Sequence, residues 1–319
     1  MRVLLIKTSS LGDVVHNLPV VTDLCARFPD AEIDWVVEES FGDIPRLHPG
    51  VRQVIPVALR RWRRSLLSPQ TWHEIGSLRK RLVAVRYDMA IDTQGLLKSA
   101  LITRTVPTRR CGYAAASARE PLASGFYDAS FEVSRSLHAV ERNRRLAAQV
   151  GGYSIDDMPD YGIAVPPAPA LCVPGGTPGP TAVLLTATSR DDKLWPEEHW
   201  IALGSELQAH GLHCQLPAGN SVERERTGRI ASRIPEASLL PPSSIGELAG
   251  HLGAARIVIG VDTGLVHLAA ALGRPTLALF SASDPALTGV LARGVAVNLG
   301  NRGLPPSVDA VLAAARPLL

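Results

Sequence analysis

Cysteine is scarce in this 319-residue sequence, and its placement favours neither a metal site nor a disulfide scaffold. The four cysteines, Cys25, Cys111, Cys172 and Cys214, form no Cys-x-x-Cys pair, and no Cys/His cluster has the spacing of a zinc site. We therefore expect buried, reduced thiols, as in proteins of the cytosol.

Long apolar runs are also missing. No run reaches the roughly 18 apolar residues that a membrane-spanning helix needs. The first apolar run, residues 3–6, is short and leads into Lys7 and a polar turn, which is unlike a signal peptide. We expect a cytoplasmic protein whose contact with a membrane is peripheral.

Acidic residues are too few in the first half of the chain to balance its lysines and arginines. Residues 1–150 contain 22 Lys and Arg against 15 Asp and Glu, a balance of +7, whereas residues 151–319 contain 11 against 15. The first half should attract the more anionic partner, such as a nucleic acid, an anionic membrane or an acidic substrate. A nucleic acid is the least expected, because this half lacks aromatic residues interleaved on a recognisable motif.

Short apolar runs alternate with helical patterns on both sides of a segment rich in proline and glycine. This alternation predicts parallel sheets with helices on both faces. The proline-rich segment can form neither a helix nor a central strand. Strands are predicted at residues 3–6, 32–37, 54–57, 89–92, 182–185, 213–216, 257–260 and 276–280. Helices are predicted from Asp13 to Leu24, at 77–85, after Gly95, and at 197–210, 222–234, 265–272 and 308–315.

The predicted fold class is therefore α/β, with two Rossmann-like parallel-sheet domains, as suits a chain of this length. We place the domains at residues 1–165 and 181–319 and the linker at 166–180. A ligand site is expected between the domains, at the carboxyl ends of the strands.

The turn that follows the first predicted strand is rich in small residues. Ser10 and Gly12 would let a substrate approach the backbone closely. Asp13 could cap the next helix or act as general base on an acceptor hydroxyl, and the turn alone does not decide between these roles. His16 could contact a substrate or lie on the surface.

A second polar turn follows the first strand of the other half. Thr188 and Ser189 offer hydroxyl groups there, and Lys193 offers a compact positive charge. A lysine in such a turn suits an anionic leaving group such as a diphosphate. The alternative is a solvated lysine beside Asp191 and Asp192.

A third turn, residues 260–267, also leads from a strand into a helix. Gly264 allows close approach to the backbone N–H groups at the helix start, which favours an anion site. Asp262, Thr263 and His267 add polar contacts. The alternative is a capped helix start with a hydrogen-bonded core histidine.

Two smaller features could belong to the same site. Glu223 could accept hydrogen bonds from a ribose, or it could cap a surface helix. Residues 59–64, LRRWRR, carry the densest charge of the chain, which by default is a solvated face. With Lys98, Arg119 and Arg142, these arginines could instead bind carboxylates or phosphates bidentately.

Taken together, these segments resemble the lipopolysaccharide heptosyltransferases of glycosyltransferase family 9. The matching stretches are KTSSLGDVVHNLP, DWVVEESF, VIPVALRRWRR, IDTQGLLKSA, AREPLAS, HAVER, TSRDDKLWPEEHW and GVDTGLVHLAAAL, from residue 1 to about 285. The AREPLAS and RRWRR stretches are most similar to the enzymes that add the first heptose.

The resemblance implies a GT-B fold, with a C-terminal helix that can cross back to the first domain. It implies inverting transfer of L-glycero-D-manno-heptose from ADP-heptose to a Kdo residue of Kdo-lipid A, without a metal or cofactor. The lack of an Asp-x-Asp motif at a strand end fits this expectation, with Lys193 and helix dipoles in place of a cation.

The resemblance also assigns roles to residues. Asp13 would be the general base and Lys193 would stabilise the departing ADP, the two facing each other from different domains. The donor would be bound by Thr188, Ser189, Lys193, Glu223, Asp262, Thr263, Gly264 and His267. The acceptor would be bound by Ser10, Gly12, Arg60, Arg61, Arg63, Arg64, Lys98 and Arg119. Residues 241–244, PPSS, depart from the family's pattern where adenine contacts are expected.

Other activities stay open at this point. A later-acting heptosyltransferase of the family and a nucleotide-sugar epimerase on the same fold are the alternatives. The basic half suits an acceptor that carries sugar carboxylates and lipid A phosphates in an anionic leaflet. We expect a monomer at the cytoplasmic face of the inner membrane, with ADP-heptose and Kdo-lipid A as partners and no nucleic acid.

Overall fold

The structure, a computed structural model, describes residues 1–155, 157–167 and 179–319. Its contacts divide the chain into two compact units, Met1–Asp157 and Met158–Leu319. Most of the predicted linker, residues 168–178, lies outside the described residues. The division falls before it because the preceding segment is bonded to the second unit. There the Tyr161 hydroxyl donates to the Leu291 carbonyl oxygen over 2.7 Å.

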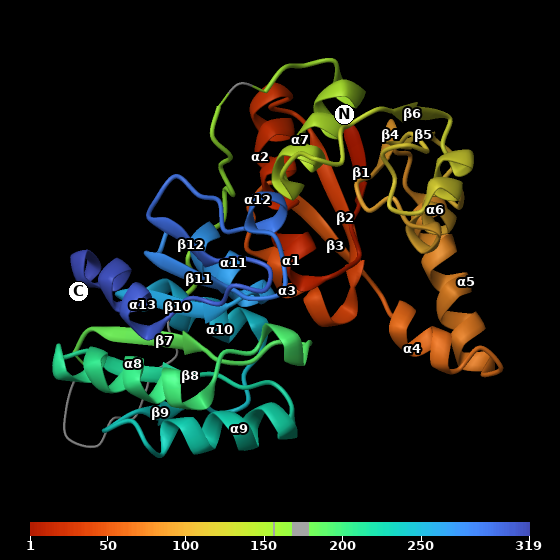
Figure 1. Cartoon of the computed structure of the whole chain (residues 1–319). Helices are drawn as coiled ribbons and strands as arrows, with labels where there is room; N and C mark the ends of the chain where they lie inside the picture. Colours follow the sequence, from red (N-terminus) through yellow and green to blue (C-terminus); the bar gives the residue numbers. More distant parts are fainter. Residues whose placement is uncertain (156, 168–178) are drawn as a thin grey trace. The chain divides into compact units, whose positions relative to one another are not determined.

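The first unit is a six-stranded sheet in the order β3-β2-β1-β4-β5-β6, and all its pairings are parallel (Figure 1). The order reverses between β1 and β4, which is where doubly wound sheets bind their ligands. Its strands are β1 Arg2–Ile6, β2 Glu32–Glu38, β3 Val51–Val57, β4 Met89–Asp92, β5 Arg109–Tyr113 and β6 Ala129–Phe131. Its helices are α1 Leu11–Val15, α2 Leu18–Arg27, α3 Asp43–Arg46, α4 Leu59–Arg64, α5 Pro69–Ala84, α6 Leu97–Arg104 and α7 Ala139–Gly151, with 3₁₀ turns η1 Glu39–Phe41 and η2 Pro121–Phe126.

The second unit repeats this topology. Its order is β12-β11-β10-β7-β8-β9, again parallel throughout, with the reversal between β7 and β10. Its strands are β7 Thr181–Leu185, β8 His213–Leu216, β9 Ser238–Leu239, β10 Ile257–Val261, β11 Thr276–Phe280 and β12 Ala296–Gly300. Its helices are α8 Glu197–Ala209, α9 Ser221–Ala231, α10 Ile245–Ala254, α11 Gly264–Ala271, α12 Pro285–Thr288 and α13 Val308–Ala315, with 3₁₀ turns η3 Asp191–Lys193 and η4 Arg316–Leu318.

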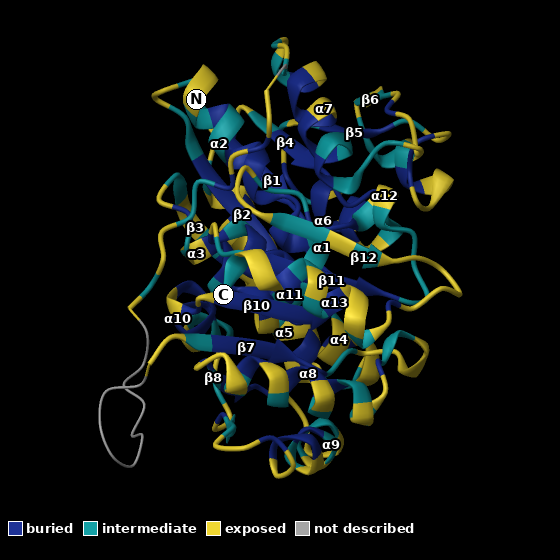
Figure 2. Ribbon diagram, turned by 60° about the vertical axis from the view of Figure 1, so that its left-hand side comes forward, coloured by how far each residue is buried: buried dark blue, intermediate teal, exposed yellow. Residues whose placement is uncertain are grey.

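The central strands are buried on both faces, as parallel strands covered by helices must be (Figure 2). In β1, the four residues after Arg2 are fully buried, and all five residues of β10 are buried. The side chains of one face of β1 pack with those of neighbouring strands and of α5, among them Leu4, Ile6 and Leu82. These apolar runs fix the position of the turns that follow the strands.

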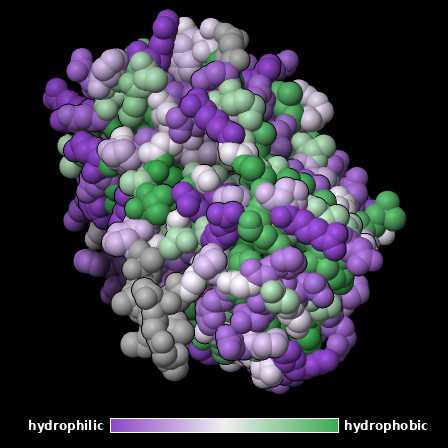
Figure 3. Space-filling model, turned by 90° about the vertical axis from the view of Figure 1, so that its left-hand side faces the viewer, coloured by the Kyte–Doolittle hydropathy of each residue, from purple (hydrophilic) through white to green (hydrophobic). Residues whose placement is uncertain are grey.

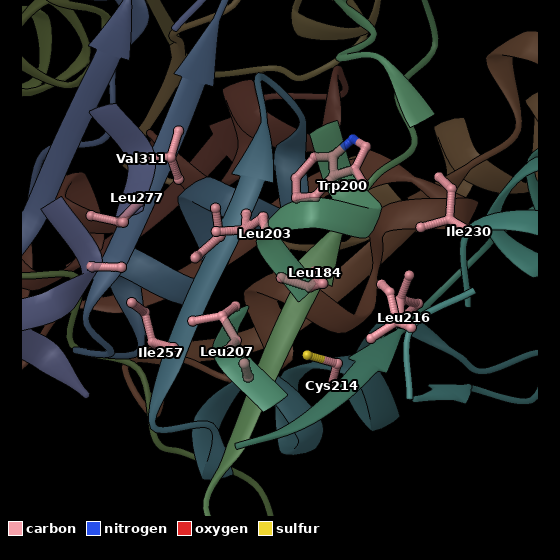
Figure 4. Close-up of a cluster of buried hydrophobic side chains, with 14 of the residues drawn as sticks. Leu184, Trp200, Leu203, Leu207, Cys214, Leu216, Ile230, Ile257, Leu277 and Val311 are labelled. Atoms are coloured by element: carbon pink, nitrogen blue, oxygen red, sulfur yellow. The ribbon is translucent and has the colours of Figure 1, made fainter. Parts of the chain in front are cut away.

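The core of the second unit includes its C-terminal helix (Figure 4). Leu203 and Leu207 of α8 pack there with Leu184 of β7 and Val311 of α13. Each large apolar side chain buried in this way contributes about 1.5–3 kcal/mol relative to exposure. The resemblance allowed for a C-terminal helix that crosses to the first unit, but the apolar side of α13 is buried in the second.

Two predicted helices differ from the observed ones by more than a few residues. The helix expected from Asp13 to Leu24 is two helices, because α1 ends at Val15 and α2 begins at Leu18. Pro19 stands in the first turn of α2, where its missing N–H is tolerated, but it could not continue a helix from α1. The helix expected at residues 77–85 begins earlier, at Pro69, behind the N-cap residue Ser68.

The described surface is mixed in character, and the thiols differ in burial. None of the helices within the described ranges is both long and apolar enough to span a bilayer. On the face in Figure 3, hydrophobic side chains are scattered among hydrophilic ones. Cys111 and Cys214 are buried as predicted, Cys25 is only partly buried, and Cys172 lies outside the described residues.

Candidate active-site residues

Asp13 lies in the first turn of α1, three residues after the N-cap residue Ser10. Its Oδ2 accepts hydrogen bonds from the Ser10 backbone N–H at 2.9 Å and from the Ser10 hydroxyl at 3.0 Å. The prediction that Asp13 itself opens the helix is wrong, because the helix begins at Leu11 and Asp13 forms a capping box with Ser10. The carboxylate is nevertheless held by the helix start.

Positive charges surround this carboxylate. Burial alone would raise the pKa of Asp13, but Lys7, Arg119 and the hydrogen bonds from Ser10 outweigh it, so the pKa lies below its usual range. The Arg119 guanidinium is 3.5 Å from the Asp13 carboxylate, whose side chain is 23% exposed. Asp13 is therefore ionised at neutral pH and remains accessible.

Lys7 provides a buried charge at the end of β1. Its ammonium donates to the Thr93 carbonyl oxygen at 2.8 Å and to Asn143 Oδ1 at 3.4 Å. Burial lowers the pKa of Lys7 to about 8, although Asp13 acts in the opposite direction. Lys7 is thus mostly protonated at neutral pH. The sequence reasoning gave it no role.

Gln94 joins the turn after β1 to the turn after β4. Its Oε1 accepts from the backbone N–H groups of Thr8 and Ser9, at 2.9 and 3.1 Å, and its Nε2 donates to the Ser9 carbonyl oxygen at 2.6 Å. Gly95 follows with a φ of +65°, which favours glycine. The sequence did not predict a role for Gln94, although its place two residues after the end of β4 could have indicated one.

The predicted acceptor residues are only partly brought together. The Lys98 ammonium donates to the Ser9 hydroxyl at 2.7 Å, beside the Asp13 turn, and burial lowers the pKa of Lys98. The Gly12 carbonyl oxygen accepts from the N–H of His16, the C-cap residue of α1. His16 is buried, and its ring packs against His138, so the alternative of a surface histidine is wrong.

The arginines of α4 differ from one another. The Arg60 guanidinium lies 5.0 Å from the centre of the Phe41 ring. Arg61 is paired with Glu39 and with Glu74, at 3.3 and 2.9 Å, and hydrogen bonds from Arg61, Trp62 and Gln70 lower the pKa of Glu74 to about 2. Arg63 and Arg64 are exposed. A pocket beside α4 is lined by Glu38, Glu39, Ser40, Arg60, Arg61, Arg64 and Ser65.

In the second unit, Lys193 is bonded to Asp262. The Lys193 ammonium lies 2.6 Å from Asp262 Oδ2, and the two side chains are only 18% and 9% exposed. The Thr188 hydroxyl donates to the Asp262 carbonyl oxygen at 3.1 Å. The alternative of a solvated lysine beside Asp191 and Asp192 is therefore wrong, since Asp192 pairs with Arg190.

Asp262 is the centre of this group, at the end of β10 and just before the N-cap residue Thr263 of α11. Burial alone would raise its pKa, but His267, Lys193 and Ser283 keep the pKa of Asp262 well below its usual range. His267 is buried with Nε2 3.7 Å from Asp262 Oδ1, and the Ser283 hydroxyl donates to Oδ2. Ser283 was not predicted.

Other predicted donor residues stand apart from this group in their hydrogen bonds. Glu223 lies in the first turn of α9, where its carboxylate accepts from the Gly219 N–H and from Asn220 Nδ2, both at 2.9 Å. Glu223 therefore makes the contacts of a helix cap, and a ribose would have to share its carboxylate with them. Ser189 is exposed, and Thr263 and Gly264 form the start of α11. Within the described ranges, no group of three or more His, Cys, Asp and Glu could hold a metal ion.

The sequence model of glycosyltransferase family 9, the heptosyltransferases, matches residues 75–312. The chain belongs to this family. It is 46% identical to lipopolysaccharide heptosyltransferase 1 of Pseudomonas aeruginosa over 310 residues, covering 94% of this chain and 84% of the relative.

Two solved structures of the family are also close. The structure of Escherichia coli heptosyltransferase WaaC with ADP superposes with a TM-score of 0.91 at 40% identity, over the full length of both chains. The same enzyme with ADP-2-deoxy-2-fluoro heptose gives a TM-score of 0.89, also at 40% identity and over the full length of both.

These findings confirm the predicted fold class, α/β with two Rossmann-like parallel sheets of the GT-B type. They also confirm the predicted family and class of enzyme, a glycosyltransferase. Both candidate groups lie at the strand-order reversal of their own sheet, after β1 and β4 in one unit and after β7 and β10 in the other.

Proposed function

We propose that the chain transfers L-glycero-D-manno-heptose from ADP-heptose to a Kdo residue of Kdo-lipid A, in the assembly of the lipopolysaccharide inner core. The observation that carries this proposal is the 46% identity, over 94% of the chain, to an enzyme named lipopolysaccharide heptosyltransferase 1. A relative of the same fold has been solved with ADP and with an ADP-heptose analogue, which supports ADP-heptose as the donor.

In this proposal the second unit binds the donor. Lys193 exchanges part of its interaction with Asp262 for the diphosphate, and the backbone N–H groups at Gly264 bind the same anion. Thr188, Ser189, Thr263 and His267 orient the nucleotide sugar around Asp262, and Glu223 accepts from the ribose. The charge of Lys193 and the start of α11 stabilise the negative charge of the leaving diphosphate, so the reaction proceeds without an essential metal.

The first unit binds the acceptor. Lys98, Arg119 and the α4 residues Arg60, Arg63 and Arg64 bind the carboxylates and phosphates of the acceptor. Arg61 joins them only by giving up its pairs with Glu39 and Glu74. Ser10 and Gly12 leave room for the sugar beside Asp13.

Asp13 acts as the general base. Its carboxylate accepts the proton of the acceptor hydroxyl while that oxygen forms a bond to the anomeric carbon of the heptose. The bond from this carbon to the diphosphate breaks, the pair of electrons leaves with ADP, and the configuration is inverted. The low pKa of Asp13 keeps the base ionised, which supports this role.

Purified protein supplied with ADP-heptose and Kdo-lipid A should release ADP. The Asp13→Asn variant should lose about 10²–10⁴ in kcat with little change in the KM for ADP-heptose. The matched control is Asp43→Asn, which removes a partly exposed carboxylate in the first turn of α3 that pairs with Arg46. An Asp13→Asn enzyme with near-normal turnover would leave Asp13 only its capping role.

Two controls separate the alternative activities. A later-acting heptosyltransferase would require an acceptor that already carries heptose, so turnover of heptose-free Kdo-lipid A excludes it. A nucleotide-sugar epimerase would consume ADP-heptose without any acceptor. We further propose that the protein acts as a cytoplasmic monomer in peripheral contact with the anionic inner membrane, which carries the acceptor.

A further inference from the structure

Three large apolar side chains stand in water at the connection between α4 and α5. Leu67 is 99% exposed, Trp72 60% and Leu66 52%. The other four tryptophans of the chain, Trp35, Trp62, Trp195 and Trp200, are all buried. Single exposed leucines are ordinary, but three such side chains within seven residues form an apolar tip.

Hydrogen bonds hold this apolar tip, Leu66, Leu67 and Trp72, in place. The Trp72 indole N–H donates to the Leu66 carbonyl oxygen at 2.8 Å, which fixes the ring beside the loop. The Thr71 hydroxyl donates to the Ser65 carbonyl oxygen at 2.9 Å and lies 3.1 Å from the Ser65 hydroxyl. The exposure of the tip is therefore a feature of a bonded loop.

The surroundings of the tip are strongly basic. Residues 59–86 contain eight Lys and Arg and a single acid, Glu74, which is bonded to Arg61 and Trp62. On α5 the buried side is formed by Thr71, Leu78 and Leu82. Arg79 and Val83 follow Trp72 at helical spacing on another side, next to Lys80, and all three are exposed.

The tip belongs to the same edge of the sheet as Asp13. β3 and β1 are parallel to their common neighbour β2, and α4 follows β3 as the Asp13 turn follows β1. In Figure 1, α1 and α4 lie at the same end of the strands of the first unit, and the α4–α5 connection projects beyond it. A membrane bound at the tip would therefore lie on the side of the edge at which the acceptor is proposed to bind.

We infer that Leu66, Leu67 and Trp72 insert into the interface of an anionic lipid bilayer while Arg79 and Lys80 contact its headgroups. Tryptophan and leucine favour the interface, and the long basic side chains can reach phosphates from an apolar contact. This inference rests on the proposed function, because it explains how a lipid-embedded acceptor meets the Asp13 edge.

Charge selects the bilayer over a second copy of the chain as the occupant. A symmetric dimer through the tip would bring two segments of +7 together, which is unfavourable, whereas an anionic leaflet attracts them. Each basic residue near such a surface strengthens binding about fivefold. Binding should therefore require anionic lipid and weaken as salt is added.

The test is flotation of the full-length protein with vesicles of phosphatidylglycerol, and with vesicles of phosphatidylcholine alone. Wild type should float with the anionic vesicles only. The affinity of the Leu66→Ser/Leu67→Ser/Trp72→Ser variant for the anionic vesicles should be lower than that of wild type by a factor of about ten or more. Leu304→Ser, which changes a leucine that is 71% exposed in the other unit, should bind as wild type does. Equal binding of the triple variant and wild type would overturn the inference.

Fluorescence gives a second readout. Because Trp72 is the exposed tryptophan, bromine-labelled phosphatidylglycerol should quench part of the wild-type emission and none of that of Trp72→Phe. Quenching that persists in Trp72→Phe would place another tryptophan in the bilayer. A wild-type dimer that becomes a monomer in the triple variant, by sedimentation equilibrium, would make the tip a protein interface instead.

A water-soluble acceptor without acyl chains separates this inference from the proposed function. The triple variant should keep wild-type turnover on the soluble acceptor and lose turnover on the acceptor embedded in vesicles. Failure of the wild type on both acceptors, with intact vesicle binding, would refute the proposed function and leave the inference standing. Equal loss on both acceptors would refute membrane docking as the role of the tip.

Discussion

The Asp262→Asn substitution is the sharpest test of the group at the end of β10. It keeps the shape of the side chain and removes the negative charge that neutralises Lys193. The two side chains are 9% and 18% exposed, so water screens their interaction little. Breaking a buried pair costs about 3–5 kcal/mol, because the remaining charge is left without its partner.

The lower end of this range is expected, since an Asn oxygen can still accept from Lys193 or Ser283. About 3 kcal/mol corresponds to a fall in Tm of about 6–12 °C for a domain of roughly 150–250 residues. The control is Asp160→Asn in the same unit. Asp160 pairs with Arg293 at 3.5 Å and both side chains are at least half exposed, so this change should cost less than about 1 kcal/mol.

The pH dependence provides an internal check. The pKa of Asp262 is depressed in the folded protein, so its contribution to stability is complete above the unfolded value of about 3.9 and is lost as the pH falls below it. The difference in Tm between wild type and Asp262→Asn should therefore be largest near neutral pH and shrink in acid.

Thermal denaturation followed by circular dichroism measures all of these quantities. ADP at about 100 times its Kd should add about 2.7 kcal/mol of stability to any variant that still binds it. Asp262→Asn should keep this gain, because Lys193 remains, whereas Lys193→Met should lose it. A Tm for Asp262→Asn equal to that of the Asp160→Asn control would refute the stabilising role of the Asp262–Lys193 pair.

Two further predictions concern the first unit. Lys7→Met removes a charge that lowers the pKa of Asp13, so the acid limb of the profile of kcat/KM against pH should move to higher pH. The control Lys7→Arg keeps a positive charge and should move this limb less. An acid limb that does not move in Lys7→Met would contradict the coupling between Lys7 and Asp13. Arg144→Met removes the guanidinium that binds Asp23 through two hydrogen bonds, at 2.8 and 3.0 Å. Because the Arg144 side chain is only 2% exposed, we expect the free energy of unfolding to fall by about 3 kcal/mol, which a lower Tm would show.

The strand pattern of the sequence predicted the sheets well because parallel strands are nearly continuous apolar runs. Strands such as β4 and β11 have the predicted bounds. β5 was missed since it begins with Arg109 and Arg110 and contains Gly112, which is no apolar run. α7 was missed for a similar reason, because its polar residues include a buried arginine, Arg144. Tertiary pairing, which composition does not show, stabilises both elements.

The sequence predicted which turns contain the candidate site residues, but not which of these residues contact one another. The rule that ligands bind after strand ends found Asp13, Lys193 and Asp262, all of which lie there. It could not show that Lys193 is bonded to Asp262, because 69 residues separate them in the sequence. Gln94 was missed because its role is to bond the backbone of the turn after β1, which depends on the register of β1 with β4.

Each unit uses a lysine from the segment that follows its first strand, with different electrostatic results. Lys7 reaches from the turn after β1 to the residue just after β4, and Lys193 reaches from the turn after β7 to the residue just after β10. Lys7 meets a carbonyl oxygen there, so its charge remains to lower the pKa of Asp13, the proposed base. Lys193 meets a carboxylate, so its charge is neutralised until another anion competes for it. This difference supports the proposed roles, a base at one sheet edge and a site for the leaving diphosphate at the other.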